Sequence, residues 1–399
     1  MKEIKSKNEI SREIYNVCNH IIGHILNLRR EFHQYPELAF HEEKTSRIIT
    51  KEINNYKNIE VFENYGNTTA VIGVIKGSLP GNTRAIRADI DALAINERTG
   101  LPFSSKNKGC MHACGHDAHI AILLGTANVI SQLKEHIQGK IVFVFQPGEE
   151  GAAGAKFLIE KGLLQDFGID EIYGYHVYPE LPARTLGVRS GVLTSNSDKI
   201  NIVIKLEKNK INKETSIDLS VVSSHLILAF QELICREIPP DESAVLTIGK
   251  VDIKDKDDND ESHAILQGTV RTLSFKIRKY IEYRMKEIFQ NMMHVFKARG
   301  KLHYLKGYPS VENSPKITKG IVELGKQFWG KENVIQLKNP LMMGEDFSFY
   351  AQKIPACYYL FGMGGIHDLH SPYFFFNEEI LNPSIAWNSF MMLNNSKKI

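Results

Sequence analysis

A chain of 399 residues is too long for one compact core and predicts two domains. Its 43% hydrophobic and 24% charged residues are ordinary for a globular protein, and its 49 basic and 46 acidic side chains are scattered, which argues against a nucleic-acid partner. No apolar stretch approaches the roughly 20 residues of a membrane span, so no membrane partner is expected. Five widely spaced cysteines and a polar N-terminus favour a reducing cytoplasm.

Helices and short apolar strands alternate along the first half of the chain. Apolar residues at three- and four-residue spacing predict a first helix that Pro36 ends. The predicted helices cover 21–35, 41–55, 120–130 and 152–161. β-rich runs predict strands over 69–76, 84–88, 139–145 and 171–177, with a turn at 78–82. The run at 139–145 is apolar throughout, as in a strand buried on both faces.

Three of these strands are followed by, or end on, side chains that can bind a metal or carry protons. They are Asp89, Glu149 and His176. An α/β sheet builds its site outside the carboxyl ends of its strands, so we expect these three residues to lie at one edge of a sheet.

The stretch 111–119 is the densest group of ligand-type side chains in the chain. It holds one thiol, three imidazoles and one carboxylate, a composition that suggests a metal site. Cys114 and His116 lie two residues apart, which places both on one side only in an extended segment, so we expect a strand end or loop there. A disulfide or redox motif is the alternative, but Cys110 and Cys114 lack the two-residue spacing of such pairs.

The pattern changes between 196 and 304. Strands are predicted over 199–206, 244–251, 264–273 and 301–305, and helices over 217–235 and 277–295. The order β-α-β-β-α-β is that of a ferredoxin-like sandwich. Apolar β runs and glycine-rich turns return at 335–348 and 356–365. We therefore predict an α/β domain, formed by 1–195 and 305–399, into which a second domain of 196–304 is inserted.

Six runs of this sequence resemble one known group of enzymes. They occupy 28–37, 87–93, 111–117, 145–151, 344–348 and 369–372, and span nearly the whole chain. Together they are similar to the N-acyl-amino-acid amidohydrolase branch of the dinuclear metallopeptidases, which includes aminoacylases, hippurate hydrolases and auxin-conjugate hydrolases. The resemblance implies a metallopeptidase-type α/β catalytic domain and an inserted ferredoxin-like lid that often mediates dimerisation, and so a homodimer.

The resemblance also implies the residues of the site. Two divalent metal ions would be held by Cys114, His116, Glu150, His176 and His370, with Glu149 as general acid/base. The mixed Cys/His/Glu set admits Zn, Mn, Co or Ni. His112, His119 and His367 match no ligand position of the family and are expected either to support the ligands from behind or to be structural.

Chemistry argued from the residues agrees with these roles. Neighbours on an extended chain point apart, so Glu150 can bind metal while Glu149 holds the attacking water. The alternative is a pair of solvated charges at a helix start. Asp89 is expected to orient a ligand imidazole, and Arg271 to clamp a substrate carboxylate. For His176 or His370 alone, a core or surface histidine is the alternative.

The segment 207–214 departs from the family. There the lid normally carries a histidine that reaches the substrate, and this sequence has none. Two functions follow. The first is a metal-dependent hydrolase that cleaves N-acyl amino acids or small peptides. The alternative is a metal-binding homologue with little or no hydrolytic activity, because losing one donor to a developing oxyanion costs on the order of 10²–10³ in turnover.

Overall fold

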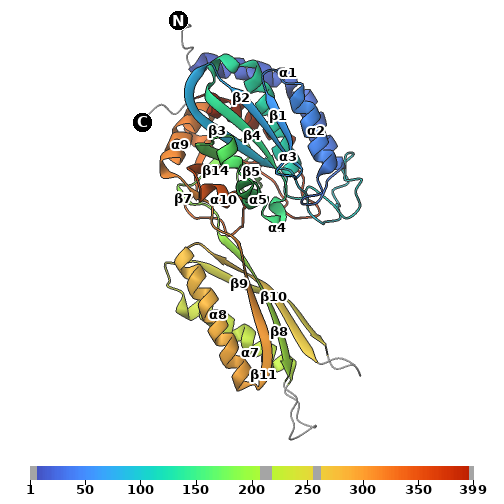
Figure 1. Ribbon diagram of the computed structural model, residues 1–399, viewed down its shortest axis with the longest axis vertical. Coiled ribbons are helices and arrows are strands. Elements are labelled where there is room, and N and C mark those ends of the chain that lie inside the picture. The colour runs from blue at the N-terminus through green and yellow to red at the C-terminus, as the bar shows by residue number, and fades with distance from the viewer. Residues whose placement is uncertain (1–6, 207–217, 255–261, 395–399) are drawn as a thin grey trace. The chain divides into compact units, whose positions relative to one another are not determined.

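The computed structural model describes residues 7–206, 218–254 and 262–394. They form two compact units (Figure 1). The first unit comprises Met1–Leu193, Glu312–Lys338 and Asp346–Ile399, and the second comprises Thr194–Val311 and Asn339–Glu345. The inserted domain was predicted at 196–304, and 339–345 was predicted to belong to the catalytic domain. That the second unit acts as a lid and pairs two chains stays a prediction.

Within its described residues, the first unit contains an eight-stranded sheet in the order β1-β2-β4-β3-β5-β14-β6-β13. The four central strands β4, β3, β5 and β14 run parallel. The strands are β1 (Glu60–Tyr65), β2 (Ala70–Lys76), β3 (Leu79–Asp89), β4 (Gln138–Gln146), β5 (Glu171–Tyr178), β6 (Leu186–Val188), β13 (Val334–Gln336) and β14 (Ala356–Gly362). The carboxyl ends of the central strands therefore share one edge, as predicted for the site.

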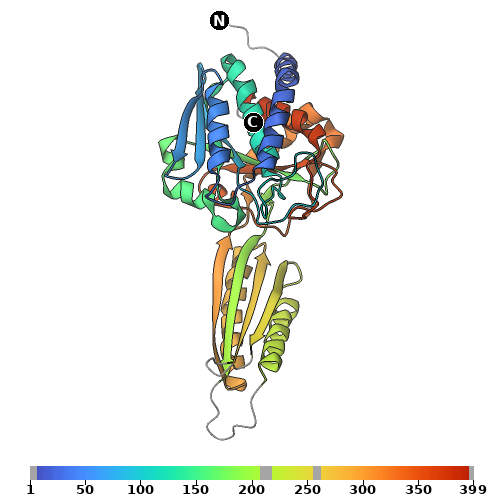
Figure 2. The same cartoon turned by 90° about the vertical axis from the view of Figure 1, so that its right-hand side faces the viewer.

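A layer of long helices covers one face of this sheet, and Figure 2 looks towards it. The layer consists of α1 (Lys7–Gln34), α2 (Glu43–Asn54), α3 (His116–Gln132), α9 (Pro315–Trp329) and α11 (Leu381–Leu393). Alternate residues of the strands, such as Phe143, Tyr175 and Tyr359, join the apolar sides of these helices in one hydrophobic core. Burial of this core fixes which residues of each strand face the helices.

One local expectation is wrong, and one helix begins later than expected. The predicted turn at 78–82 lies inside β3, which begins at Leu79 and pairs irregularly with β4 up to Thr83. Gly139 allows this pairing, because a Cβ there would lie 2.1 Å from the Asn82 carbonyl oxygen. The helix expected at 152–161 is α5 (Gly154–Glu160), which begins after Ala153 because that residue is left-handed and ends the short α4 (Glu149–Ala152).

Among its described residues, the second unit forms a four-stranded antiparallel sheet in the order β11-β8-β10-β9. The elements are β8 (Asn196–Leu206), α7 (Leu219–Glu232), β9 (Ala244–Lys254), β10 (His263–Thr272), α8 (Phe275–Val295) and β11 (Ala298–Tyr308). Even-numbered residues of β8, such as Ile202, pack against Leu226 and Met285 of the two helices. This is the predicted ferredoxin-like sandwich, and the predicted α/β fold class with an inserted α+β unit is confirmed.

The sequence was expected to contain no stretch that could span a membrane, but one helical segment of the second unit meets the criteria of length and composition. This segment is Leu219–Glu237. It nevertheless buries Val222, Leu226 and Phe230 in the core of the unit. A helix that packs one side on a sheet passes the same test, so this finding alone is weak evidence for a span.

Candidate metal centre

The turn before α3 carries the first two predicted ligands. Cys114 lies in the turn, and His116 is the first residue of α3. Gly115 between them is left-handed (φ 86°), and a Cβ there would lie 2.6 Å from the Val177 side chain. Glycine therefore lets the turn approach β5 closely. This approach puts Cys114 Sγ 3.2 Å from His176 Nε2.

His370 reaches the same sulfur from a distant part of the sequence. Its Nε2 lies 3.3 Å from Cys114 Sγ and 3.4 Å from Glu150 Oε1. Its backbone N–H donates to the carbonyl oxygen of Ala113 at 2.8 Å, which ties its loop to the turn that carries the thiol. With His116, which groups with the same thiol, the other four predicted ligands thus all have a ligand atom within 4.8 Å of one sulfur atom.

Two of the imidazoles are held so that the same ring nitrogen faces the site. His116 Nδ1 lies 2.9 Å from the carbonyl oxygen of Asp91, and His176 Nδ1 lies 2.6 Å from that of Val177. A carbonyl oxygen only accepts, so both Nδ1 atoms carry the proton. Nε2 is then the nitrogen through which each ring can bind a metal, once that atom carries no proton.

Glu149 and Glu150 follow β4 on a short loop and have different surroundings. Glu150 lies in a candidate ligand group with Cys114 and His370, whose ligand atoms are within 4.8 Å of one another. Glu149 is only 6% exposed and shares a second such group with His116 and Glu150. Of the two glutamates, only Glu150 shares a group with the thiol of Cys114, as expected if the two carboxylates have separate tasks.

The donor atoms of this cluster fit a divalent metal. Among the described residues, His116 Nε2 and Glu150 Oε1 are buried and make no hydrogen bond. A buried polar atom without a hydrogen bond is costly, so such atoms call for a further binding partner. A thiol, imidazole nitrogens and carboxylate oxygens at this spacing suit Zn, Mn, Co or Ni.

The electrostatics also favour a cation. Burial, with the charge of Glu150, raises the pKa of Cys114 well above its usual value. Burial lowers the pKa of His176, which keeps this imidazole neutral. For His116 burial acts in the same sense, but the charge of Asp89 outweighs it and raises the pKa to about 10. A bound cation would replace the protons on Cys114 and His116.

Asp89 and Asp91 divide their contacts in a way that the sequence analysis missed. Asp89 Oδ1 accepts a hydrogen bond from His119 Nδ1 (2.5 Å), whereas His116 Nε2 lies 3.7 Å from Asp89 Oδ2. Asp91 is the residue that holds His116, through its carbonyl oxygen, and its Oδ2 accepts the backbone N–H of Glu150 at 2.9 Å. The signal was present as a second carboxylate two residues further along the same run.

The other histidines have structural surroundings. His119 donates to Asp89 and accepts the N–H of Val177 at 3.0 Å, so both ring nitrogens are occupied. His112 is buried, and burial lowers its pKa to about 4. His367 packs against the rings of Tyr373 and Phe375. None of the three falls in a group with Cys114 or Glu150.

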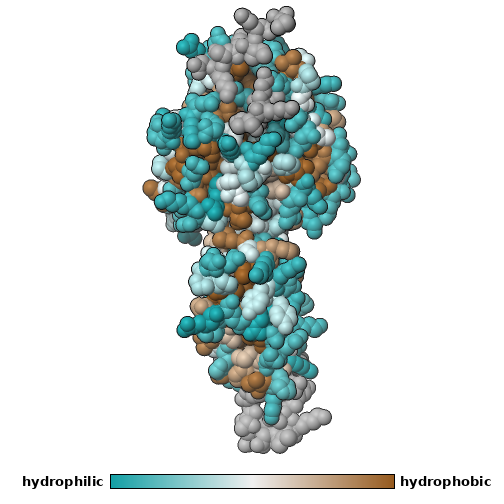
Figure 3. Space-filling view, turned by 90° about the vertical axis from the view of Figure 1, so that its left-hand side faces the viewer, coloured by the Kyte–Doolittle hydropathy of each residue, from teal (hydrophilic) through white to brown (hydrophobic). Residues whose placement is uncertain are grey.

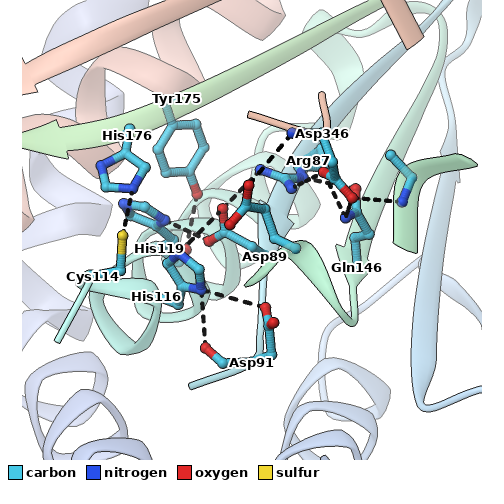
Figure 4. Close-up of polar contacts among 12 residues, drawn as sticks. Arg87, Asp89, Asp91, Cys114, His116, His119, Gln146, Tyr175, His176 and Asp346 are labelled. Atoms are coloured by element: carbon cyan, nitrogen blue, oxygen red, sulfur yellow. Dashed lines mark hydrogen bonds and ion pairs between the residues drawn. The ribbon is translucent and has the colours of Figure 1, made fainter. Parts of the chain in front are cut away.

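A buried ionic cluster lies beside the candidate ligands (Figure 4). Arg87 donates to Gln146 Oε1 at 2.9 Å, to Asp89 Oδ2 at 2.7 Å and to Asp346 Oδ1 at 2.8 Å. All four side chains are 0% exposed. Arg87 and Asp346 belong to the family-like runs 87–93 and 344–348, but the contact between them was not predicted from the sequence.

Arg271, the expected carboxylate clamp, lies on β10 of the second unit. Its Nη1 is buried without a hydrogen bond, and burial lowers its pKa. A guanidinium with a spare donor suits a carboxylate ligand. Its role at the metal centre stays a prediction.

Glu42 holds the base of the loop that carries the two glutamates, and it predicts a pH effect. Its Oε1 accepts the backbone N–H groups of Gly148 and Phe40, and its Oε2 accepts the Thr69 hydroxyl. Burial raises the pKa of Glu42 from 4.5 to about 7. The folded state therefore binds this proton more tightly than the unfolded chain, and the stability that the proton provides is lost as pH rises from about 5 to 8.

Wild type should lose up to about 3 kcal/mol of unfolding free energy between pH 5 and pH 8 through Glu42, and we expect Glu42→Gln to abolish this loss. Glutamine fits, because its carbonyl accepts the two N–H groups and its amide donates to a rotated Thr69 hydroxyl. Urea unfolding at pH 5 and pH 8, with chelator present, measures the difference. The exposed neighbour provides the control, Glu43→Gln, which should behave as wild type. Equal pH dependence in the Glu42→Gln variant and wild type would contradict the expectation.

Comparison with known proteins identifies close likenesses. The model of peptidase family M20/M25/M40 matches residues 85–392. The chain is 38% identical to an N-acetyldiaminopimelate deacetylase of Lactobacillus acidophilus, over 85% of this chain and 89% of that protein. It is 35% identical to an N-acetylcysteine deacetylase of Bacillus subtilis (90% and 93%), and 32% identical to thermostable carboxypeptidase 1 of Saccharolobus solfataricus (98% and 100%).

Two solved structures are similar along nearly the whole chain. A dinuclear metal-binding peptidase of the M20 family from Bacillus subtilis superposes with a TM-score of 0.80 at 32% identity, over 94% of this chain and 98% of that one. A putative aminohydrolase from methicillin-resistant Staphylococcus aureus gives 0.85 at 31% identity, over 96% and 99%. The resemblance drawn from the six sequence runs is thereby confirmed.

Proposed function

The chain belongs to peptidase family M20/M25/M40 and is a hydrolase of amide bonds, and we propose that it hydrolyses N-acyl amino acids or small peptides with two divalent metal ions. The observation that carries the proposal is the grouping of the five predicted ligands around one thiol, with the buried carboxylate of Glu149 beside them. Metal storage alone would not require that spare carboxylate. The names of the relatives, two deacetylases of acetylated amino acids and a carboxypeptidase, support the same substrate class.

We assign the ions to Cys114, His116, Glu150, His176 and His370. Bound there, two cations would lower the pKa of a water and polarise an amide carbonyl. The assignment rests on the neutral imidazole of His176, on the atoms without hydrogen bonds and on the closely grouped ligand atoms. Zn, Mn, Co and Ni all suit this ligand set.

Glu149 supplies the proton transfers in this proposal. Its carboxylate lies in one group with His116 and Glu150, so it can take a proton from the attacking water and pass it to the leaving amine. Asp91 keeps both neighbours in place, because it accepts from the ring of His116 and from the backbone N–H of Glu150. Arg271 receives the substrate carboxylate.

The non-hydrolytic alternative rests on 207–214, which lies outside the described residues. No described residue favours it. The complete set of ligands and Glu149 favours hydrolysis, and we propose that function alone.

A panel of N-acetyl and N-benzoyl amino acids, assayed for released amine with Zn, Mn, Co and Ni in turn, tests the proposal. We expect turnover on at least one member. Each substrate is compared with its carboxamide, which lacks the carboxylate. Arg271→Ala should raise KM about 10-fold or more for the acid and leave the carboxamide unchanged, since a charged hydrogen bond contributes roughly 1.5–3 kcal/mol. No turnover on any member, with both metals bound, would favour the non-hydrolytic alternative.

We further propose that the chain works in the cytoplasm as a homodimer whose contact lies on the second unit. Five free cysteines suit a reducing compartment. Apolar side chains lie among polar ones on the surface of that unit (Figure 3), and Val221, Leu228 and Val295 are exposed there. The mass in solution by sedimentation equilibrium tests the dimer, and a monomer at micromolar concentration would exclude a stable one.

A further inference from the structure

We propose that Asp346 is a positioning residue for Glu149, and that Arg87 and Gln146 hold Asp346 in the orientation this requires. The inference rests on the proposed function, because it assumes that Glu149 transfers the protons. Asp346 touches neither the candidate ligands nor a substrate in this proposal. It acts through the carboxylate and the loop that it holds.

The carboxylate of Asp346 is fixed by donors on both of its oxygens. Oδ1 accepts from Arg87 Nη2 at 2.8 Å and from Gln146 Nε2 at 3.0 Å. Oδ2 accepts from Gln146 Nε2 at 2.9 Å and from the backbone N–H of Ala155 at 2.9 Å. A carboxylate that accepts charged and neutral donors in this way has one favourable orientation. The side chain is 0% exposed, so water cannot replace a lost donor.

Asp346 contacts the glutamate loop at two points. Its own backbone N–H points to Glu149 Oε1 at 3.4 Å. This contact is long, and such hydrogen bonds often tighten only when a substrate binds. Its Oδ2 holds Ala155, the second residue of α5, at the other end of the same loop. One residue thus contacts both the carboxylate and the point where its loop ends.

The loop between these points is closed on itself and has little freedom to compensate. The N–H of Gly154 donates to the carbonyl oxygen of Gly148 at 2.9 Å. A Cβ at Gly154 would lie only 1.7 Å from the carbonyl oxygen of Pro147. Because the two ends of the loop touch, a shift of Ala155 is passed to Glu149. A displacement of about 1 Å at a catalytic group can cost roughly 100-fold in rate.

The ionic partners explain why an aspartate is needed. Gln146 turns its carbonyl to Arg87 Nε and to the Tyr350 hydroxyl, which leaves its amide to donate to Asp346. An asparagine at position 346 would replace one accepting oxygen by an NH₂ group, which would then face the N–H donors of Arg87, Gln146 or Ala155. The mismatch cannot be resolved by turning Gln146, because its amide would then face Arg87.

The first experiment compares Asp346→Asn with wild type, with kcat and KM normalised to folded, metal-loaded chain. We expect kcat to fall about 10- to 100-fold, while KM changes less than about twofold and the metal content stays the same. A purely structural role would lower stability and leave kcat per loaded chain unchanged, and that result would overturn the inference. A loss of metal in proportion to the loss of activity would overturn it too.

The matched control is a rescue. Gln146→Glu alone places a second carboxylate against Asp346 and should also lower kcat. The double variant Gln146→Glu with Asp346→Asn moves the negative charge from position 346 to position 146. The glutamate carboxylate then accepts a hydrogen bond from the asparagine NH₂ group. We expect the double variant to exceed the kcat of Asp346→Asn by about tenfold. A double variant no more active than Asp346→Asn would overturn the pairing that we infer.

Glu149→Gln, assayed in parallel, separates this inference from the proposed function. If Glu149→Gln abolishes turnover and Asp346→Asn lowers it as stated, both stand. If Glu149→Gln abolishes turnover and Asp346→Asn does not lower kcat, only the positioning role fails. If Glu149→Gln is fully active, the assigned role of Glu149 fails and the positioning role fails with it.

Discussion

Replacing Glu149 by glutamine should lower kcat by about 10²–10⁴ while the chain keeps its metal. A glutamine has the shape of the glutamate but no group that takes a proton near neutral pH, and general acid/base catalysis contributes an amount of this order. Thermal stability should stay close to that of wild type, because the carbonyl oxygen of the glutamine side chain can still accept the backbone N–H of Asp346. Single-turnover kinetics and metal analysis of the same preparation measure both quantities.

The neighbouring carboxylate provides the matched control. Glu150→Gln should lose metal, and activity with it, because Glu150 groups with Cys114 and His370. Excess metal should restore part of the activity of Glu150→Gln and none of that of Glu149→Gln. Identical behaviour of the two variants would contradict the division of roles between these neighbours.

The fold could be predicted from the sequence to the level of its elements. Apolar periodicity located α2, α3, the second half of α1 and the buried strand β4, and the β-α-β-β-α-β order located the second unit. The helices α9 and α11 were not predicted. Periodicity failed where two segments of backbone approach closely. Pro80 and Gly81 indicated a turn, yet β3 begins at Leu79 and shifts its register against β4 up to Thr83, where Gly139 of the neighbouring strand allows a close approach. Such an approach depends on a partner segment that local pattern does not contain.

The ligands could be predicted because each belongs to a run that resembles a family, and because their types suit a metal. The residues that hold these ligands in place were harder to predict from the sequence. Asp91 stands beside Asp89 in the same run, and only the geometry separates the one that contacts His116 from the one that contacts His119. Asp89 ends β3 and Asp91 follows it, and a side chain's direction beyond a strand end is not fixed by the two-residue period.

Asp346 could not be assigned a role from sequence at all. Its contacts with Arg87 and Gln146 join residues more than 190 positions apart. A pair at that separation leaves no periodic or spacing signal in one sequence. The buried charge itself is the physical clue, because an aspartate with no exposure needs a cation or several donors beside it.

The second large effect is expected from removing two ligands together. A Cys114→Ala, His176→Ala variant should fall from about two equivalents of divalent metal per chain to less than one, because these atoms lie 3.2 Å apart at the centre of the cluster. Loss of both removes the thiolate and one neutral imidazole that the ions require. Metal analysis after purification without chelator, and again after reconstitution with Zn or Mn, measures the content.

A control of the same residue types is available away from the cluster. Cys357 is buried on β14 and His367 packs on aromatic rings, so Cys357→Ala, His367→Ala should keep both ions. Stability provides a second readout. Metal at about 100 times its dissociation constant should stabilise wild type by about 2.7 kcal/mol per site. The ligand variant should show no such gain. A wild-type content near zero after reconstitution, or an unchanged content in the ligand variant, would contradict the assignment of the ions to this centre.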